Sequence, residues 1–255
     1  MFSYTFGVIG NDKVGNLLLS LLEEGNISTD GIIIDSERPT TSKLRVLSNG
    51  HQLLRIDSEK IENIRNTIEE KIKIKIEKHI IDSEAIIFED YNKGFLTEKI
   101  IRDVIKLASH SNKLVTVDPK INFLESYKNC TLFKPNKNEA EQISGIKINN
   151  ERALLQSAKK IFDRINPKYL LITLAEDGMV LFDARLIPKY FAAKARKIAD
   201  VSGAGDTVIS IITAALVHKY KIDEAVKLAN TGAGIVVEKR GVVPIKPEEI
   251  DFGYK

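Results

Sequence analysis

The sequence of 255 residues contains a single cysteine, Cys130, and this scarcity excludes an internal disulfide and a metal cluster built from cysteines. Long apolar runs are missing as well, and no segment approaches the length of a membrane span. The first residues lack the basic stretch and apolar core of a signal peptide. We therefore expect a cytoplasmic protein that has no membrane partner.

Blocks of one charge sign are equally scarce. The net charge is +3, and basic residues alternate with acidic ones, as in Glu69-Glu70-Lys71. This pattern argues against nucleic acid as a partner. Hydrophobic residues (43%) and charged residues (29%) are as frequent as in an ordinary soluble globular protein, and the length suits one large α/β domain or two small ones.

Short strand-like runs alternate with amphipathic patterns along the chain. The predicted strands cover residues 4–9, 85–89, 114–117, 169–173 and 179–182, and the predicted helices cover 14–24, 59–78, 97–110, 151–164, 204–220 and 222–238. This alternation predicts an α/β fold with a mainly parallel sheet covered on both faces. Active sites of such folds lie beyond the carboxyl ends of the strands.

One segment breaks the alternation. Residues 43–48 and 52–57 read as two strands around Asn49-Gly50, which is a strong hairpin signal. Because a two-stranded ribbon is marginal alone, we expect it to lean on another part of the protein and to serve as a flap over a site. Its polar face carries Lys43, Arg45, Gln52 and Arg55.

Residues 71–76 alternate like a strand, but a helix is favoured there. The isoleucines of this region fit one helical stripe that continues from upstream, and the lysines then form a solvated face. The stripe consists of Ile61, Ile64, Ile68, Ile72 and Ile76.

The segment 200–207, with the sequence DVSGAGDT, precedes an apolar helical pattern. The loop therefore opens onto a helix N-terminus, where free N–H groups and the helix dipole hold phosphate oxygens. Asp206 would repel a resting anion, so its presence needs a reason. It could accept a proton from a hydroxyl that attacks phosphate, or it could cap the first helical turn.

Asn136 and Glu139 follow a second apolar patch, residues 131–133. They could organise Mg²⁺ and its waters around nucleotide phosphates, since Mg²⁺ prefers oxygen ligands. Alternatively, an Asn at the N-cap and a Glu three residues later form a capping box.

Two further segments could either bind a nucleotide or have a purely structural role. Thr173 lies at a strand end and Gly178 in a turn, and both could contact a nucleotide or could simply form the turn. The small residues of 229–234 interrupt a helical pattern and permit close packing against a purine or against another helix.

In order and spacing these motifs resemble the ribokinase-like sugar kinases, also called the PfkB family, over essentially the whole chain. The resemblance implies a three-layer α/β/α fold in one domain over residues 1–255, with a small β flap at about 38–57, and the cofactors ATP and Mg²⁺. It implies that Asp206 is the catalytic base and that Gly203, Ala204 and Gly205 form an anion hole. The implied ATP-binding residues are Asn136, Lys137, Asn138, Glu139, Thr173, Gly178, Asn230, Gly232 and Ala233, of which Asn136 and Glu139 hold the metal through water.

Within that family the chain looks most like the heptose 7-phosphate kinases. Residues 38–45 and 52–57 look like the substrate flap of that subgroup, and residues 117–120 and 239–241 match further elements. Residues 89–94 are similar to its Ser-Asp-Tyr-x-Lys-Gly element, with Glu89 in place of Ser. The implied acceptor is D-glycero-D-manno-heptose 7-phosphate, and the implied substrate-binding residues are Lys43, Arg45, Gln52, Arg55, Asp90, Lys93 and Lys120.

Residues 7–15 align with an element that normally lies well inside this kinase domain. We therefore expect the chain to be truncated at its N-terminus, without the first strand and a Gly-Gly-x-x-Asn sugar-binding segment, and to carry no nucleotidyltransferase domain. Missing core strands would expose a sheet edge, and we expect a homodimer through the flap or that edge. A dehydrogenase is not indicated, because the spacing is GxxGxDxxG and Asp12 is better explained as a helix cap.

The leading hypothesis is a sugar-phosphate kinase in which Asp206 accepts the proton of the anomeric hydroxyl during in-line attack on ATP. Two alternatives stay open. The acceptor could be a fructose phosphate or a nucleoside, or the chain could be a truncated, non-catalytic protein that binds a nucleotide or a partner. The cation-rich flap favours a phosphorylated acceptor.

Overall fold

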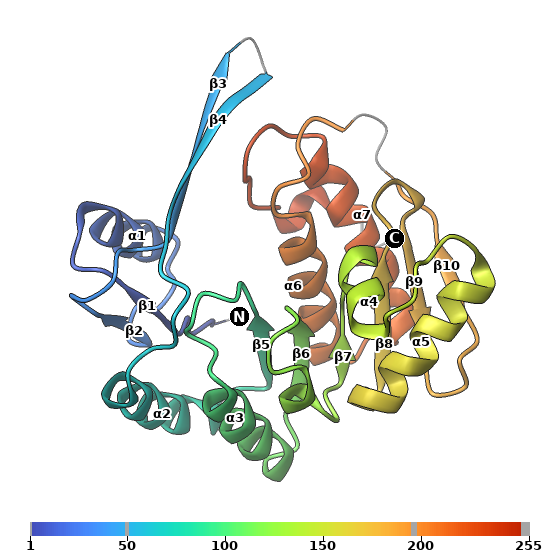
Figure 1. Cartoon of the computed structure of the whole chain (residues 1–255), viewed down its shortest axis with the longest axis horizontal. Coiled ribbons are helices and arrows are strands. Elements are labelled where there is room, and N and C mark those ends of the chain that lie inside the picture. The colour runs from blue at the N-terminus through green and yellow to red at the C-terminus, as the bar shows by residue number, and fades with distance from the viewer. Residues whose placement is uncertain (1, 49–50, 195–197, 251–255) are drawn as a thin grey trace. The chain divides into compact units, whose positions relative to one another are not determined.

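The computed structural model describes residues 2–48, 51–194 and 198–250 (Figure 1). The chain divides into two compact units, and each is described by itself. Met1–Ser83 and Asn92–Leu107 form what we call the flap unit, and Glu84–Tyr91 and Ala108–Lys255 form what we call the sheet unit.

The sheet unit is built on six strands in the order β10-β9-β8-β7-β6-β5. The four strands β5 to β8 are parallel, β9 is antiparallel to β8, and β10 is antiparallel to β9. The predicted mainly parallel sheet is therefore confirmed, with an antiparallel edge. The strands are β5 (Ala85–Glu89), β6 (Leu114–Asp118), β7 (Leu132–Phe133), β8 (Tyr169–Thr173), β9 (Met179–Phe182) and β10 (Lys189–Phe191).

Helices cover this sheet on both faces. α6 and α7 pack against the face that presents Leu132, Leu171 and Leu181. Phe133 and Leu170 point to the opposite face, because side chains alternate along a strand, and they are fully buried too. The helices are α4 (Lys137–Ser144), α5 (Glu151–Ile165), α6 (Ala204–Val217) and α7 (Ile222–Val237), with 3₁₀ turns η1 (Leu124–Tyr127), η2 (Ala175–Asp177) and η3 (Pro247–Glu249).

The flap unit contains two small two-stranded sheets. β1 and β2 are parallel, whereas β3 and β4 form an antiparallel hairpin that confirms the predicted flap strands (Figure 1). The predicted Asn49-Gly50 turn lies outside the described residues. The elements are β1 (Gly7–Ile9), α1 (Lys13–Glu24), β2 (Ile32–Ile34), β3 (Ser42–Ser48), β4 (His51–Ser58), α2 (Asn66–Ile80) and most of α3 (Glu98–His110).

Asp12 caps α1, as the sequence predicted. Its carboxylate accepts hydrogen bonds from the backbone N–H groups of Gly15 and Thr40, each at 2.8 Å. These backbone donors, with Thr40 the stronger, lower the pKa of Asp12. The carboxylate therefore ties the start of α1 to the segment that leads into the flap.

The predicted helix at 59–78 was wrong at its start, because α2 begins only at Asn66. Backbone groups upstream of it bond to other segments of the flap unit: the Ile64 N–H donates to the Gly94 carbonyl (2.9 Å), and Arg38 donates to the Glu62 carbonyl (2.8 Å). Residues 71–76 are helical, as predicted. In the part of the chain that the structure describes, no helix combines the length and apolarity needed to cross a membrane.

Candidate active site

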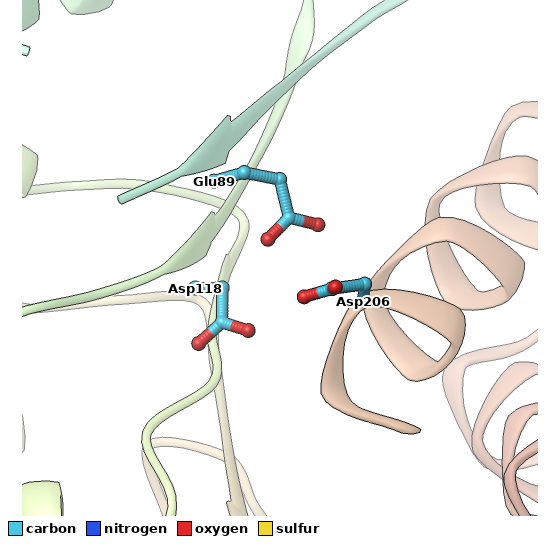
Figure 2. Close-up of side chains that lie close together, drawn as sticks. All are labelled: Glu89, Asp118 and Asp206. Atoms are coloured by element: carbon cyan, nitrogen blue, oxygen red, sulfur yellow. The ribbon is translucent and has the colours of Figure 1, made fainter. Parts of the chain in front are cut away.

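Three acidic side chains converge in the sheet unit (Figure 2). Glu89 ends β5, Asp118 ends β6, and Asp206 lies in the first turn of α6. One carboxylate oxygen from each lies within 4.8 Å of the other two. Glu89 and Asp118 are register partners in neighbouring parallel strands, so the sheet itself sets them side by side. We call these three residues the carboxylate cluster.

A buried lysine balances part of this negative charge. Lys134 directly follows β7, is 2% exposed, and holds its ammonium nitrogen 2.7 Å from the Asp118 carboxylate. Its backbone N–H donates to the Val117 carbonyl at 2.8 Å. A Cβ added at Gly205 would lie 3.3 Å from the Lys134 ammonium and 3.4 Å from the Asp118 carboxylate. The ion pair therefore lies directly against the first turn of α6.

Burial and mutual repulsion shift the proton affinities of this cluster. Burial, reinforced by the charges of Asp118 and Asp206, raises the pKa of Glu89 to about 8. Burial also raises the pKa of Asp118, although Lys134 opposes this rise. Desolvation of the Tyr91 hydroxyl, reinforced by the negative charge of Asp206, raises the pKa of Tyr91. The cluster thus favours fewer negative charges than it has carboxyl groups.

The loop before α6 presents a helix N-terminus, as predicted. Gly203 is the N-cap residue in the left-handed conformation (φ +80°), which glycine adopts without strain. The Asp200 carboxylate accepts from the Ser202 N–H (2.9 Å) and the Gly241 N–H (3.2 Å), which fixes the loop. The Ala204 N–H already donates to the Val201 carbonyl at 3.3 Å. The helix dipole favours an anion here, including an ionised Asp206.

The capping box predicted as one role of Asn136 and Glu139 is confirmed. The Asn136 Oδ1 accepts from the Glu139 N–H, and a Glu139 carboxylate oxygen accepts from the Asn136 N–H, each at 2.9 Å. The second Glu139 oxygen accepts from Lys120. The Asn136 amide and the Glu139 carboxylate offer oxygen atoms of the kind that Mg²⁺ prefers as ligands. Because these oxygens already accept hydrogen bonds, they suit an ion that is held through water molecules. Lys137 and Asn138 are exposed in the same first turn of α4.

Two of the predicted nucleotide residues lie side by side. Thr173 forms a parallel bridge with Asn136 at the end of β8, and its N–H donates to the Pro135 carbonyl (3.2 Å). Glycine at position 178 has a structural role, because its φ is +89° and an added Cβ would lie 2.1 Å from the Phe191 carbonyl oxygen. Asn230 is 5% exposed, and its side chain donates to the Ala192 carbonyl (2.7 Å).

The predicted helix at 222–238 is confirmed as α7, which runs unbroken through the small residues of 229–234. An added Cβ at Gly232 would lie 2.3 Å from the Ile211 Cδ1 of α6, and Ala233 packs against the core cluster. The small residues therefore allow α6 and α7 to approach closely, which is the alternative that the sequence left open.

Two of the predicted substrate residues belong to the sheet unit and are engaged there. Asp90 is buried and accepts from the Tyr127 hydroxyl at 3.0 Å. Lys120 bonds to Glu139. Burial lowers the pKa of Lys120, but the bond to Glu139 and the negative charges of Glu139, Asp118 and Asp90 together outweigh this effect and raise it.

The other predicted substrate residues belong to the flap unit. Lys43 bonds to Asp57 (3.0 Å) and Glu59 (3.2 Å), and Lys93 bonds to Glu59 (2.7 Å). Arg55 pairs with Asp57 at 3.0 Å, and Arg45 lies directly opposite Arg55 in the hairpin register. The Gln52 side chain lies outside the described residues. The cations of the flap thus share one face with two carboxylates.

Glu89, Asp118, Tyr91 and Lys134 were not predicted as site residues. A signal was present, because a polar or charged residue ends or directly follows each of three consecutive short apolar strands. Only the strand order β5-β6-β7 shows that these three strand ends are neighbours.

The carboxylate cluster thus lies at a helix N-terminus beyond the carboxyl ends of parallel strands, a place where α/β proteins commonly bind phosphate groups. The model of the pfkB family carbohydrate kinases matches residues 3–249. The chain therefore belongs to this family of kinases.

Curated relatives include the bifunctional protein HldE of Aliarcobacter butzleri (strain RM4018), which is 40% identical over 243 residues, and that of Desulfatibacillum aliphaticivorans, which is 38% identical over 244 residues. These matches cover 95% and 96% of this chain but 51% and 50% of the relatives. The chain thus spans about half the length of these proteins.

Solved structures confirm the ribokinase-like fold. Phosphofructokinase-2 from Escherichia coli in complex with potassium superposes with a TM-score of 0.77 at 16% identity, over 94% of this chain and 77% of that one. Arabidopsis thaliana ribokinase complexed with ribose and ATP gives 0.74 at 19% identity, with the same coverage. At these identities the likeness concerns the fold alone.

Proposed function

We propose that this chain transfers the γ-phosphoryl group of ATP to a sugar phosphate, with the anomeric hydroxyl of D-glycero-D-manno-heptose 7-phosphate as acceptor. The observation that carries the proposal is the position of Asp206 in the first turn of α6, beside the buried ammonium of Lys134. A carboxylate that can accept a proton and the positive end of a helix dipole thus lie together in the sheet unit. That combination suits a hydroxyl that loses its proton while it attacks a phosphate.

In the proposed reaction Asp206 accepts the hydroxyl proton. The acceptor oxygen forms a bond to the γ-phosphorus, the bond from that phosphorus to its bridging oxygen breaks, and ADP leaves. The N–H groups of Gly203 and Gly205 and the Lys134 ammonium stabilise the charge on the transferred group, and each such donor is worth about 2–4 kcal/mol in a transition state. Asn136 and Glu139 would hold Mg²⁺ through water, and the ion would supply further positive charge at the phosphates.

ATP as the donor is supported by family membership and by the Arabidopsis ribokinase structure, which shares this fold and was solved with ATP. We place the nucleotide along the first turn of α4 and the end of β8, where Asn136 and Thr173 lie together. Lys137 and Asn138 are exposed there for contact.

A phosphorylated acceptor is supported by the flap hairpin. Arg45 lies opposite Arg55, and Arg55 pairs with Asp57 at 3.0 Å, so two guanidinium groups share one neighbouring carboxylate. An acceptor phosphate would supply further negative charge to these cations. The heptose follows from the motifs at 38–45 and 89–94, and the relatives named HldE agree with it. Fructose 6-phosphate is the second candidate, because Escherichia coli phosphofructokinase-2 in complex with that sugar has the same fold (TM-score 0.73).

The proposal includes a homodimer formed through the flap. Leu44 and Val46 of β3 pair with Ile56 and Leu54 of β4, so the four share one hairpin face, and each is at least 40% exposed. An aliphatic face of this kind on a two-stranded ribbon favours a partner of the same chemistry, and a second copy provides one.

The test measures ADP release from ATP and Mg²⁺ with heptose 7-phosphate, fructose 6-phosphate and adenosine as acceptors. We expect the highest kcat/KM with heptose 7-phosphate. Turnover of adenosine alone would exclude a sugar-phosphate kinase. ATP binding in calorimetry without ADP release from any acceptor would support the non-catalytic alternative.

A further inference from the structure

We infer that Glu89 is a positioning residue for the proposed base: it carries the single proton of the carboxylate cluster and, as a neutral hydrogen-bond donor, lets Asp206 remain ionised. The inference rests on the proposed function, because an ionised Asp206 matters only if this residue accepts a proton during phosphoryl transfer.

The carboxylate cluster has more acidic groups than one neighbouring cation can balance. Three carboxylate oxygens from Glu89, Asp118 and Asp206 lie within 4.8 Å of one another. Lys134 offers them one positive charge, at 2.7 Å from Asp118. Like charges this close and partly buried repel strongly, and one shared proton removes that repulsion.

The surroundings of the three carboxyl groups indicate which one holds the proton. Asp118 has an ammonium partner, and Asp206 lies at the positive end of the α6 dipole. Among the ion pairs of residues 2–48, 51–194 and 198–250, none includes Glu89. Burial and its two acidic neighbours raise the pKa of Glu89 to about 8, in agreement with this assignment.

The charged groups around Glu89 come from several elements. Its own segment contributes Tyr91, the segments that follow β6 and β7 contribute Lys120 and Lys134, and α4 and α6 contribute Glu139 and Asp206. Lys120 is bonded to Glu139 and is therefore balanced locally.

Carboxylate oxygens alone would also suit a divalent cation. However, the buried Lys134 ammonium lies 2.7 Å from Asp118 and would repel a cation bound directly to that carboxylate. The ion proposed at Glu139 differs, because it is held through water and the neighbouring Lys120 is 40% exposed. We therefore assign no metal to the carboxylate cluster, and a proton is the better match to the charge that is left.

One consequence is a loss of activity at alkaline pH. When Glu89 ionises, it adds a negative charge beside Asp206 and beside the helix end proposed to bind phosphate. The transferred phosphoryl group is then repelled, so turnover falls as pH rises through the pKa of Glu89.

The kinetic test compares Glu89→Gln, which imitates the protonated acid, with Glu89→Ala, which removes the donor. We expect kcat of the wild type to fall above a pH of about 8. In Glu89→Gln this fall in kcat should move to a pH that is higher by about one unit or more. Near neutral pH the kcat of Glu89→Gln should stay within about fivefold of the wild-type value, a factor that corresponds to roughly one hydrogen bond. Glu89→Ala should be slower than Glu89→Gln at neutral pH. Glu125→Gln, an exposed change on η1 of the same unit, should keep the wild-type profile.

The same alkaline fall in Glu89→Gln as in the wild type would overturn the inference. So would an equal loss of turnover in Glu89→Gln and Glu89→Ala at every pH, because Glu89 would then be needed as an anion.

A second measurement needs no turnover. The pKa of Glu89 is raised in the folded state to about 8, whereas in the unfolded state it is about 4.3. The contribution of Glu89 to the free energy of unfolding is therefore full below a pH of about 4.3 and is lost as pH rises through about 8. The Tm of the wild type should therefore fall relative to that of Glu89→Gln between these pH values, and a constant difference contradicts the inference. If no acceptor is turned over, the proposed function fails while this comparison still shows whether Glu89 holds the proton.

Discussion

The ammonium of Lys134 lies 2.7 Å from the carboxylate of Asp118, at the point where two neighbouring parallel strands end. The lysine side chain is 3% exposed and the aspartate side chain 16%, so both charges are largely removed from water. Such a pair is costly to bury and costlier to break, because the remaining charge is left without compensation. The residues around it are accordingly placed by electrostatics as well as by packing.

Lys134→Met should therefore destabilise the protein by about 3–5 kcal/mol, since it leaves the Asp118 carboxylate buried without its partner. Urea denaturation measures the free energy of unfolding. Lys128→Met is the matched control, because Lys128 pairs with Glu125 at the surface, where the side chains are 49% and 55% exposed, and the change should cost less than about 1 kcal/mol. The double change Lys134→Met with Asp118→Asn should recover part of the loss. Equal effects of the two methionine variants would show that the buried pair does not matter for stability.

Asn136 and Asn150 allow a capping role to be separated from a nucleotide role. Both are N-cap residues whose side chains accept a backbone N–H at 2.9 Å, Asn136 for α4 and Asn150 for α5. Replacement of either by Ala should cost about 1 kcal/mol of unfolding free energy. Only Asn136→Ala should also raise the KM for ATP and the Mg²⁺ concentration required. An equal KM for ATP in both variants would remove Asn136 from the nucleotide site.

The aliphatic face of the flap should control the oligomeric state. We expect the wild type to sediment as a dimer, and Leu44→Asp with Ile56→Asp to sediment as a monomer, because charges would replace two apolar side chains of the proposed interface. Ile74→Asp is the control, since Ile74 is an isoleucine on α2 that is even more exposed (67%) than Ile56 (50%). A monomeric wild type, or a double variant that stays dimeric, would contradict an interface at the flap.

The parts of the fold with strong periodicity could be predicted from the sequence. The hairpin, the parallel strands and the bounds of α1, α3, α5 and α7 followed from local patterns. Strands of two or three residues, such as β2 and β7, give too short a pattern to be identified. The start of α2 was predicted too early, because the Gly94 carbonyl takes the Ile64 N–H, and no local pattern shows such a distant contact.

The candidate site was predictable only in part. The loop around Asp206 has a local signal, because glycines and an aspartate precede an apolar helix pattern. Lys134 follows a short apolar run, but a lysine before a proline looks like an exposed turn residue. Its burial follows from the sheet order, which places the ends of β5, β6 and β7 side by side. The cluster is therefore a property of the tertiary structure and not of any one segment.

The most direct test of the account is the rate of ADP release by Asp206→Asn with heptose 7-phosphate as acceptor. General-base catalysis contributes about 10²–10⁴-fold, so the rate should fall by this factor while ATP still binds and the Tm stays near that of the wild type. Asp163→Asn, an exposed change on α5, should keep the wild-type rate. If Asp206→Asn instead releases ADP as fast as the wild type, Asp206 is not the base and the central claim is contradicted.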